Sequence, residues 1–130
     1  QPITIILADL DRLKAINDGY GHKEGDYAIR SVANALKKIC PKGSICTRYG
    51  GDEMLAVCPN KLDVADIKEQ FAKYFAELNE KSGKPYKIEA STGIYITEPG
   101  DALGFEDIVE KSDRLMYQDK ELHKKVKAGL

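Results

Sequence analysis

The chain has 130 residues, of which 42% are hydrophobic and 32% charged, as expected for one ordinary globular domain. Its 20 basic and 21 acidic residues leave a net charge of −1, which argues against nucleic-acid binding through a broad basic face. The longest apolar run is far too short to cross a bilayer and follows no signal segment. We therefore expect a cytoplasmic domain that makes no direct membrane contact.

A nearly unbroken apolar run over residues 3–8 predicts a strand that is covered on both faces. The run ends on an acid, Asp9, which such a strand delivers to the edge of a sheet. Residues 12–18 then predict a short helix, which Gly19 and Gly21 interrupt.

Later segments alternate between the two hydrophobic periods. Apolar residues recur at helical spacing over 29–39, 64–78 and 105–116, and the pattern alternates over 87–97. With a pair of strands that flank segment 48–54, the expected order is β-α-α-β-β-α-β-α in one α+β domain, similar to a ferredoxin-like, palm-like layer. We expect the acids on one edge of its sheet and the helices packed on the opposite face.

Three cysteines, Cys40, Cys46 and Cys58, are odd in number and lack the paired spacing of metal ligands. They fall in or beside expected helices and strands. We therefore expect reduced structural thiols rather than disulfides or a zinc site.

Two glycines and two carboxylates stand between short apolar runs in segment 48–54, Arg-Tyr-Gly-Gly-Asp-Glu-Met. The pattern predicts a hairpin whose turn, Gly50-Gly51, tolerates positive φ and puts Asp52 and Glu53 at its tip. If the hairpin pairs beside the first strand, Asp9 and Asp52 meet, and converging carboxylates bind a hard cation such as Mg²⁺. A solvated turn is the alternative, since this composition is common in turns.

Seven ordered blocks of sequence resemble the GGDEF domain, the diguanylate cyclase family, which joins two GTP molecules into cyclic di-GMP. The blocks are Asp9-Leu10-Asp11 with Leu13-Lys14, Ile16-Asn17-Asp18, Tyr20-Gly21-His22, Gly25-Asp26, segment 48–54, Ser91-Thr92-Gly93-Ile94, and segment 112–120. A lone Gly-Gly-Asp-Glu is a weak signal, whereas seven blocks in order are specific. The resemblance implies the palm-like sheet of the nucleotidyl cyclases.

The resemblance also implies a metal and catalytic centre. Its metal ligands map to Asp9, Asp52 and the backbone carbonyl of Leu10, with Mg²⁺ as the cofactor and Mn²⁺ as a substitute. Asp52 and Glu53 are the implied catalytic residues, either of which could assist deprotonation of the attacking ribose hydroxyl. For Glu53 the alternative is a structural acid that satisfies donors of the hairpin.

Guanine recognition is implied for Asn17 and Asp26. A carboxylate accepts both adjacent N–H donors on the pairing edge of guanine, and adenine offers no such pair, so Asp26 predicts GTP over ATP. Both residues have a structural alternative: Asn17 could end the short helix, and Asp26 could cap a helix beginning at Tyr27.

Phosphate contacts are implied for Lys14, Lys120 and Lys124, and for backbone amides near Arg12 and Leu13 at the start of the helix. Lys124 stands where the family commonly has arginine. Lysine keeps the charge but loses the bidentate fork, which predicts weaker binding of the triphosphate.

Three further departures concern packing and regulation. Met54 replaces a usual phenylalanine, a conservative change at a buried position. The product-inhibition motif Arg-x-x-Asp would fall at Pro41 and Ser44, so we expect no feedback at that site. The usual upstream helix and Asp-x-Leu-Thr turn are missing. We therefore expect a single domain over 1–130 that is a fragment of a larger signalling protein with an upstream sensor domain, and membrane anchoring of that parent protein stays open.

Three functions remain open at this stage. The first is a diguanylate cyclase in which two antiparallel domains of a homodimer each hold one GTP. The second is a catalytically weak or silent domain that acts as a GTP-binding regulatory module, which the change at Lys124 favours. The third is a class III cyclase that cyclises a single nucleotide, against which the hairpin and Asp26 count.

Overall fold

The computed structural model describes residues 2–98, 100 and 102–127. In chain order the elements are β1 (Ile3–Leu10), α1 (Leu13–Tyr20), α2 (His22–Ile39), β2 (Ile45–Gly50), β3 (Glu53–Cys58), α3 (Val64–Ser82), β4 (Ala90–Thr97) and α4 (Phe105–Lys127). The predicted element order and the α+β class are confirmed.

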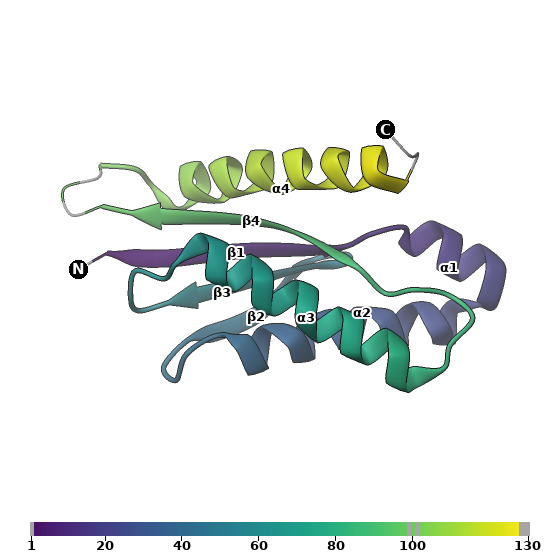
Figure 1. The fold of residues 1–130 in the computed structure, drawn as a ribbon. Helices are drawn as coiled ribbons and strands as arrows, with labels where there is room; N and C mark the ends of the chain where they lie inside the picture. The colour runs from purple at the N-terminus through teal and green to yellow at the C-terminus, as the bar shows by residue number, and fades with distance from the viewer. Residues whose placement is uncertain (1, 99, 101, 128–130) are drawn as a thin grey trace.

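The four strands form one antiparallel sheet in the order β2-β3-β1-β4, with β1 near its centre (Figure 1). In the middle of β1, Ile6 pairs with Ala56 on one side and Ile94 on the other. The unbroken apolar run of β1 follows from this position, because the strand has a neighbour on each side and helices above and below.

Helices cover both faces of the sheet, so the expectation of helices on one face is wrong. Alternate residues of β1, including Ile6 and Leu10, pack with α2 and α3 in the main core. The intervening residues Ile5 and Leu7 pack against Met116 of α4 on the second face. The physical reason is the two-residue period of β1, which is apolar in both phases and needs cover on both sides.

Gly93 sets how closely α4 approaches the sheet. A Cβ at this position would overlap the backbone carbonyl oxygen of Ser112 on α4. Because α4 lies over β1 and β4, the outward face of the edge strand β2 stays uncovered, and Ile45 is 67% exposed.

Local signals explain the ends of α3. The side chain of Asp63 accepts a hydrogen bond from the amide of Asp66 at 3.1 Å, and Gly83 ends the helix with φ of +62°.

All three cysteines are free thiols. No helix within the described ranges is both long and apolar enough to span a bilayer.

Candidate active site

The hairpin and the first strand meet as predicted. At the end of β1, Asp9 pairs with Glu53 of β3 on one side and with Ser91 of β4 on the other. The turn between β2 and β3 is closed by Arg48, whose Nε donates to the carbonyl oxygen of Gly51 at 2.6 Å. Gly51 has φ of +26°, and the strand register shifts just before it.

This pairing brings the carboxylates of Asp9 and Asp52 together. Burial, opposed by the charge of Lys120 and reinforced by the charge of Asp52, raises the pKa of Asp9 to about 7. Asp9 Oδ1 is buried and has no hydrogen-bond partner in the described part of the chain. An acceptor oxygen that is buried, unpartnered and next to a second carboxylate is suited to a cation.

Glu53 lies beside the same pair. Burial raises the pKa of its carboxyl, and the negative charges of Asp113 and Asp52 raise it further. Among the described residues its carboxylate makes no hydrogen bond to the hairpin. The alternative in which Glu53 satisfies hairpin donors therefore has no support in this geometry.

Lys120 reaches from α4 into the carboxylate cluster. Its Nζ lies 3.2 Å from the carbonyl oxygen of Leu10, 3.1 Å from Asp11 Oδ1 and 3.5 Å from Asp9 Oδ2. The lysine expected to bind phosphate thus contacts two of the residues expected to bind metal.

Asp11 organises this end of the sheet, a role that the sequence did not suggest. It is 7% exposed and accepts a hydrogen bond from Ser91 Oγ at 2.6 Å, while His123 Nδ1 lies 2.7 Å from its other oxygen. Burial alone would raise the pKa of Asp11, but hydrogen bonds from Ser91, His123 and Lys120 outweigh it and lower the pKa. The available signal was a second acid directly after a buried strand. Its partner His123 is 112 residues away, so no local pattern could identify the contact.

The α1–α2 hairpin carries the residues expected to bind guanine. Asn17 lies within α1 and does not end it, and Asp26 lies inside α2, which begins at His22. The interpretation of Asp26 as a cap for a helix starting at Tyr27 is therefore wrong, because Gly21 ends α1 and α2 begins directly after it.

Asn17 has a buried amide oxygen that lacks a partner among the residues the structure describes. A Cβ at Gly25 would overlap this oxygen, so the glycine leaves the space that the Asn17 side chain needs. Asp26 is exposed on the same helix as Gly25. An unpartnered buried acceptor on α1 and an exposed carboxylate one residue after the glycine that faces it are suited to a ligand with several N–H donors.

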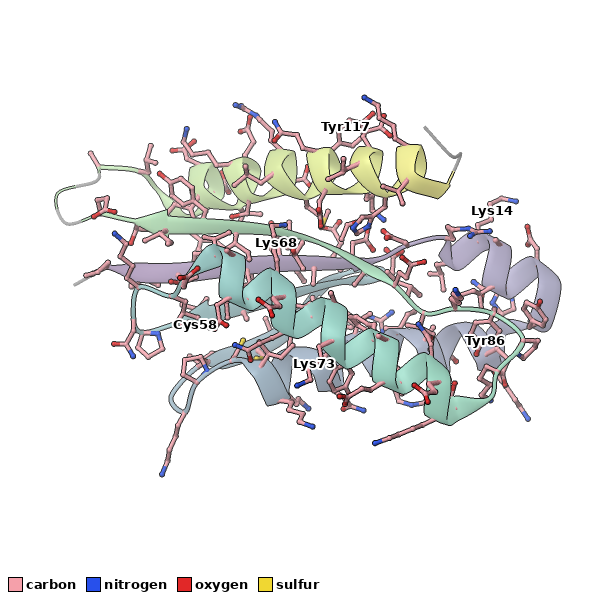
Figure 2. All side chains as sticks on the ribbon, viewed as in Figure 1. Lys14, Cys58, Lys68, Lys73, Tyr86 and Tyr117 are labelled. Atoms are coloured by element: carbon pink, nitrogen blue, oxygen red, sulfur yellow. The ribbon has the colours of Figure 1, made fainter. Side chains whose placement is uncertain are left out.

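The remaining expected phosphate ligands lie outside the carboxylate cluster. The Lys14 side chain is 91% exposed, points away from the sheet and pairs with Asp18 at 2.9 Å (Figure 2). Lys124 is also exposed and lies 3.6 Å from Glu121. At the start of α1, Arg12 has φ of +63° and makes no side-chain cap, so the first amides of this helix are available to an anion.

A loop between α3 and β4 braces the α1–α2 hairpin. Tyr86 Oη donates to Glu24 Oε1 at 2.6 Å, and the rings of Tyr86 and Tyr20 lie 5.0 Å apart (Figure 2). Lys84 pairs with Glu24 at 2.9 Å and lies over the ring of Tyr27. These contacts join the loop to the last residue of α1 and to the first two turns of α2.

Acidic and histidine side chains alone do not complete a metal centre. Within residues 2–98, 100 and 102–127, no three His, Cys, Asp or Glu side chains are grouped so that they could hold an ion. A cation here would need the carbonyl of Leu10 and further oxygens, from water or from a bound phosphate, besides Asp9 and Asp52.

A protein-family model described as "Diguanylate cyclase, GGDEF domain" matches residues 1–125. Diguanylate cyclase VdcA of Vibrio cholerae is 36% identical over 130 residues, covering 94% of this chain and 37% of that protein. The probable diguanylate cyclase DgcJ of Escherichia coli K12 is 36% identical over 123 residues, covering 92% and 23%. The chain thus spans well under half the length of these relatives.

Solved structures show the same fold. The active GGEEF domain of a diguanylate cyclase from Vibrio cholerae superposes with a TM-score of 0.74 at 27% identity, covering 93% of this chain and 78% of that one. The GGDEF domain of DgcB from Caulobacter crescentus, solved with c-di-GMP, has a TM-score of 0.74 at 24% identity and covers 92% and 72%.

Proposed function

Since the chain belongs to the GGDEF domain family of diguanylate cyclases, we propose that it condenses two GTP molecules into cyclic di-GMP and two pyrophosphates in a Mg²⁺-dependent reaction. Two copies of the domain face each other antiparallel, and each holds one GTP. The observation that carries the proposal is the meeting of Asp9 and Asp52 at the tip of the β2–β3 hairpin, where Asp9 has a buried oxygen without a partner among the described residues.

Asp9, Asp52 and the Leu10 carbonyl would hold the divalent cation, Mg²⁺ or its substitute Mn²⁺. This oxygen-only donor set suits a hard cation, and burial together with the neighbouring Asp52 raises the pKa of Asp9, which a bound cation would lower. When bound, the cation supplies charge neutralisation at the phosphates and polarises the attacking 3′-hydroxyl.

Glu53 is the better candidate to accept the proton of the 3′-hydroxyl. Burial and the nearby acids raise the pKa of its carboxyl, which makes it a stronger base than an ordinary glutamate. A carboxylate bound to metal is a weaker base, so Asp52 serves mainly as a ligand. The attack forms the new bond to the α-phosphorus, and pyrophosphate leaves.

Asp26 and Asn17 select guanine. The exposed carboxylate of Asp26 accepts the two adjacent N–H groups of the base, and the free oxygen of Asn17 adds a third acceptor in the space left by Gly25. Adenine lacks these paired donors, so GTP is preferred over ATP.

The triphosphate meets the free amides at the start of α1, with Lys14, Lys120 and Lys124 supplying charge. Lys124 lacks the fork of an arginine, so this contact contributes less. The parent protein supplies a sensor domain that brings two copies together in the cytoplasm. Neither nucleic acid nor the membrane surface is a partner of this domain.

A second candidate function is a GTP-binding regulatory module with little or no turnover. The exposed positions of Lys14 and Lys124, each paired with an acid on its own helix, favour it. Such a domain would bind GTP through the α1–α2 hairpin and signal through another part of the parent protein.

One experiment separates the two functions. The domain is fused to a dimerising coiled coil, which raises the effective concentration of the facing sites, and is incubated with GTP and Mg²⁺ before chromatography of the nucleotides. We expect cyclic di-GMP, and a loss of about 10²–10³-fold or more in rate for Asp9→Ala and Asp52→Ala, with the fold intact by circular dichroism. Activity retained in both variants contradicts the site, and GTP binding without product supports the regulatory module.

A further inference from the structure

Lys120 contacts the same oxygens that the proposed function assigns to the metal. We infer that the Lys120 ammonium fills the metal site in the metal-free protein and must withdraw before a divalent cation can bind there. The inference rests on the proposed roles of Asp9, Asp52 and Leu10. It goes beyond those roles in one respect: the cation takes the place of the Lys120 ammonium. Metal binding therefore frees Lys120 and is coupled to phosphate binding.

Oxygens of this chain surround the ammonium in its observed position. It donates hydrogen bonds to the carbonyl oxygen of Leu10 at 3.2 Å and to Asp11 Oδ1 at 3.1 Å, and it forms an ion pair with Asp9 Oδ2 at 3.5 Å. Two of its three N–H donors are therefore used in hydrogen bonds, and its charge is paired with Asp9 and Asp11. A phosphate would have to compete with these oxygens for Lys120.

The lysine and the metal exclude each other for two reasons. Mg²⁺ binds oxygen at about 2.1 Å, so a cation on the Leu10 carbonyl and on Asp9 would lie close to the ammonium nitrogen. Two positive charges that close repel each other strongly, and here burial limits screening by water. One of them has to leave.

Asp9 keeps an acceptor for the cation that replaces the ammonium. Its Oδ2 faces Lys120, whereas its Oδ1 is buried and has no hydrogen-bond partner in the described part of the chain, and Asp52 is a neighbouring charge. Once Lys120 has withdrawn, a divalent cation can therefore use both Asp9 and Asp52.

Only the lysine side chain needs to move. Helix α4 is fixed on the sheet by the close approach at Gly93 and by the contact between His123 and Asp11, both of which leave its backbone in place. The Lys120 side chain is 24% exposed, so its end has a route to solvent. Once released, the ammonium is close to the metal and available to an anion bound there. Binding of the metal and of the phosphate then favour each other.

The first test measures the affinity of the nucleotide-free protein for Mn²⁺ by electron paramagnetic resonance. We expect Lys120→Met to bind Mn²⁺ about tenfold more tightly than the wild type, because a competing charge has been removed. Lys125→Met is the matched control, since this lysine also lies on α4, is exposed and has no proposed role in binding. It should leave the Mn²⁺ affinity unchanged.

An Asp52→Asn variant in each background separates failure of this inference from failure of the proposed function. If Asp52→Asn weakens Mn²⁺ binding but Lys120→Met does not strengthen it, the result contradicts the exchange of Lys120 for the cation and still supports the proposed metal site. If Asp52→Asn leaves the Mn²⁺ affinity unchanged in both backgrounds, the proposed metal site is wrong and the exchange with it.

A second test uses the wild-type protein and does not depend on how the variants fold. Lysines are modified with an amine-reactive ester in the presence and absence of Mg²⁺, and the sites are quantified by mass spectrometry. We expect Mg²⁺ to increase the modification rate of Lys120 severalfold, while Lys14, already 91% exposed, serves as the unchanged reference. A Lys120 rate that does not respond to Mg²⁺ overturns the inference.

Discussion

The carboxylate end of the sheet and the α1–α2 hairpin satisfy their polar groups in different ways. At the sheet, Asp11 is buried and bonded to Ser91, His123 and Lys120, which come from two other elements. On the α1–α2 hairpin, the side-chain amide oxygen of Asn17 has no hydrogen-bond partner in the described ranges. The difference teaches that the protein itself satisfies Asp11, whereas Asn17, like Asp9 Oδ1, keeps a buried acceptor that is suited to a ligand.

Two glycines show the same contrast. A Cβ at Gly93 would meet backbone atoms of α4, which cannot move without the helix. A Cβ at Gly25 would meet mainly the side chain of Asn17, which can rotate away. Substitution of the first should therefore damage the fold, and substitution of the second should damage ligand binding.

Gly93→Ala should have the largest effect. We expect it to lower the free energy of unfolding by about 3 kcal/mol, because α4 has to shift away from β4. Urea denaturation followed by circular dichroism measures this. Gly50→Ala is the control, since a Cβ at Gly50 on the edge strand β2 meets nothing within 4 Å. Equal stability of the two variants would refute the role of Gly93 in packing.

Gly25→Ala should raise the KM for GTP about tenfold and leave kcat nearly unchanged, because the displaced Asn17 amide no longer meets the base. Steady-state kinetics of the coiled-coil fusion measures both constants. Gly19→Ala on α1 is the control, since nothing lies within 4 Å of its added Cβ. If kcat falls and KM does not change, Gly25 affects the chemistry at the carboxylate end of the sheet and not GTP binding at the α1–α2 hairpin.

Tyr86→Phe tests the brace on the hairpin. The change removes the hydroxyl that donates to Glu24 and keeps the ring beside Tyr20, so we expect a loss of about 1 kcal/mol in the free energy of unfolding and a small rise in the KM for GTP. Tyr117→Phe is the control, because the contact of its hydroxyl with Glu121, at 3.3 Å, is exposed (Figure 2). An unchanged KM would show that the brace does not position the hairpin.

The smallest effect concerns pH. Hydrogen bonds from Tyr86 and Lys84 lower the pKa of Glu24 below its ordinary value of 4.5. A carboxyl whose pKa is lower in the folded state stabilises the fold above the unfolded pKa, and this contribution is lost as pH falls through the folded pKa. The stability advantage of the wild type over Glu24→Gln should therefore be full at neutral pH and shrink below about pH 4.5, measured by thermal denaturation across that range. An advantage that does not depend on pH would contradict the shift.

The spacing of apolar residues predicted the helices and strands well, because it follows directly from which side chains are buried. The apolar run of β1 and the turn at Gly50-Gly51 placed Asp9 at the end of β1 and Asp52 in the turn just before β3, the strand that pairs with β1. Local capping was less informative. Asp26 resembles an N-cap, yet α2 begins four residues earlier at His22, since packing of α2 against α1 and the sheet outweighs a single capping preference.

By itself the sequence determined the order of the elements, the hairpin and the family, because each depends on local periods and ordered motifs. Only the tertiary structure decided that helices cover both faces, that Asp11 is bonded to His123, and that Lys120 lies among the proposed metal ligands. These contacts join residues about a hundred positions apart. They depend on how closely α4 packs on β4 and on the electrostatic balance of buried charges, and no single segment of sequence contains either quantity.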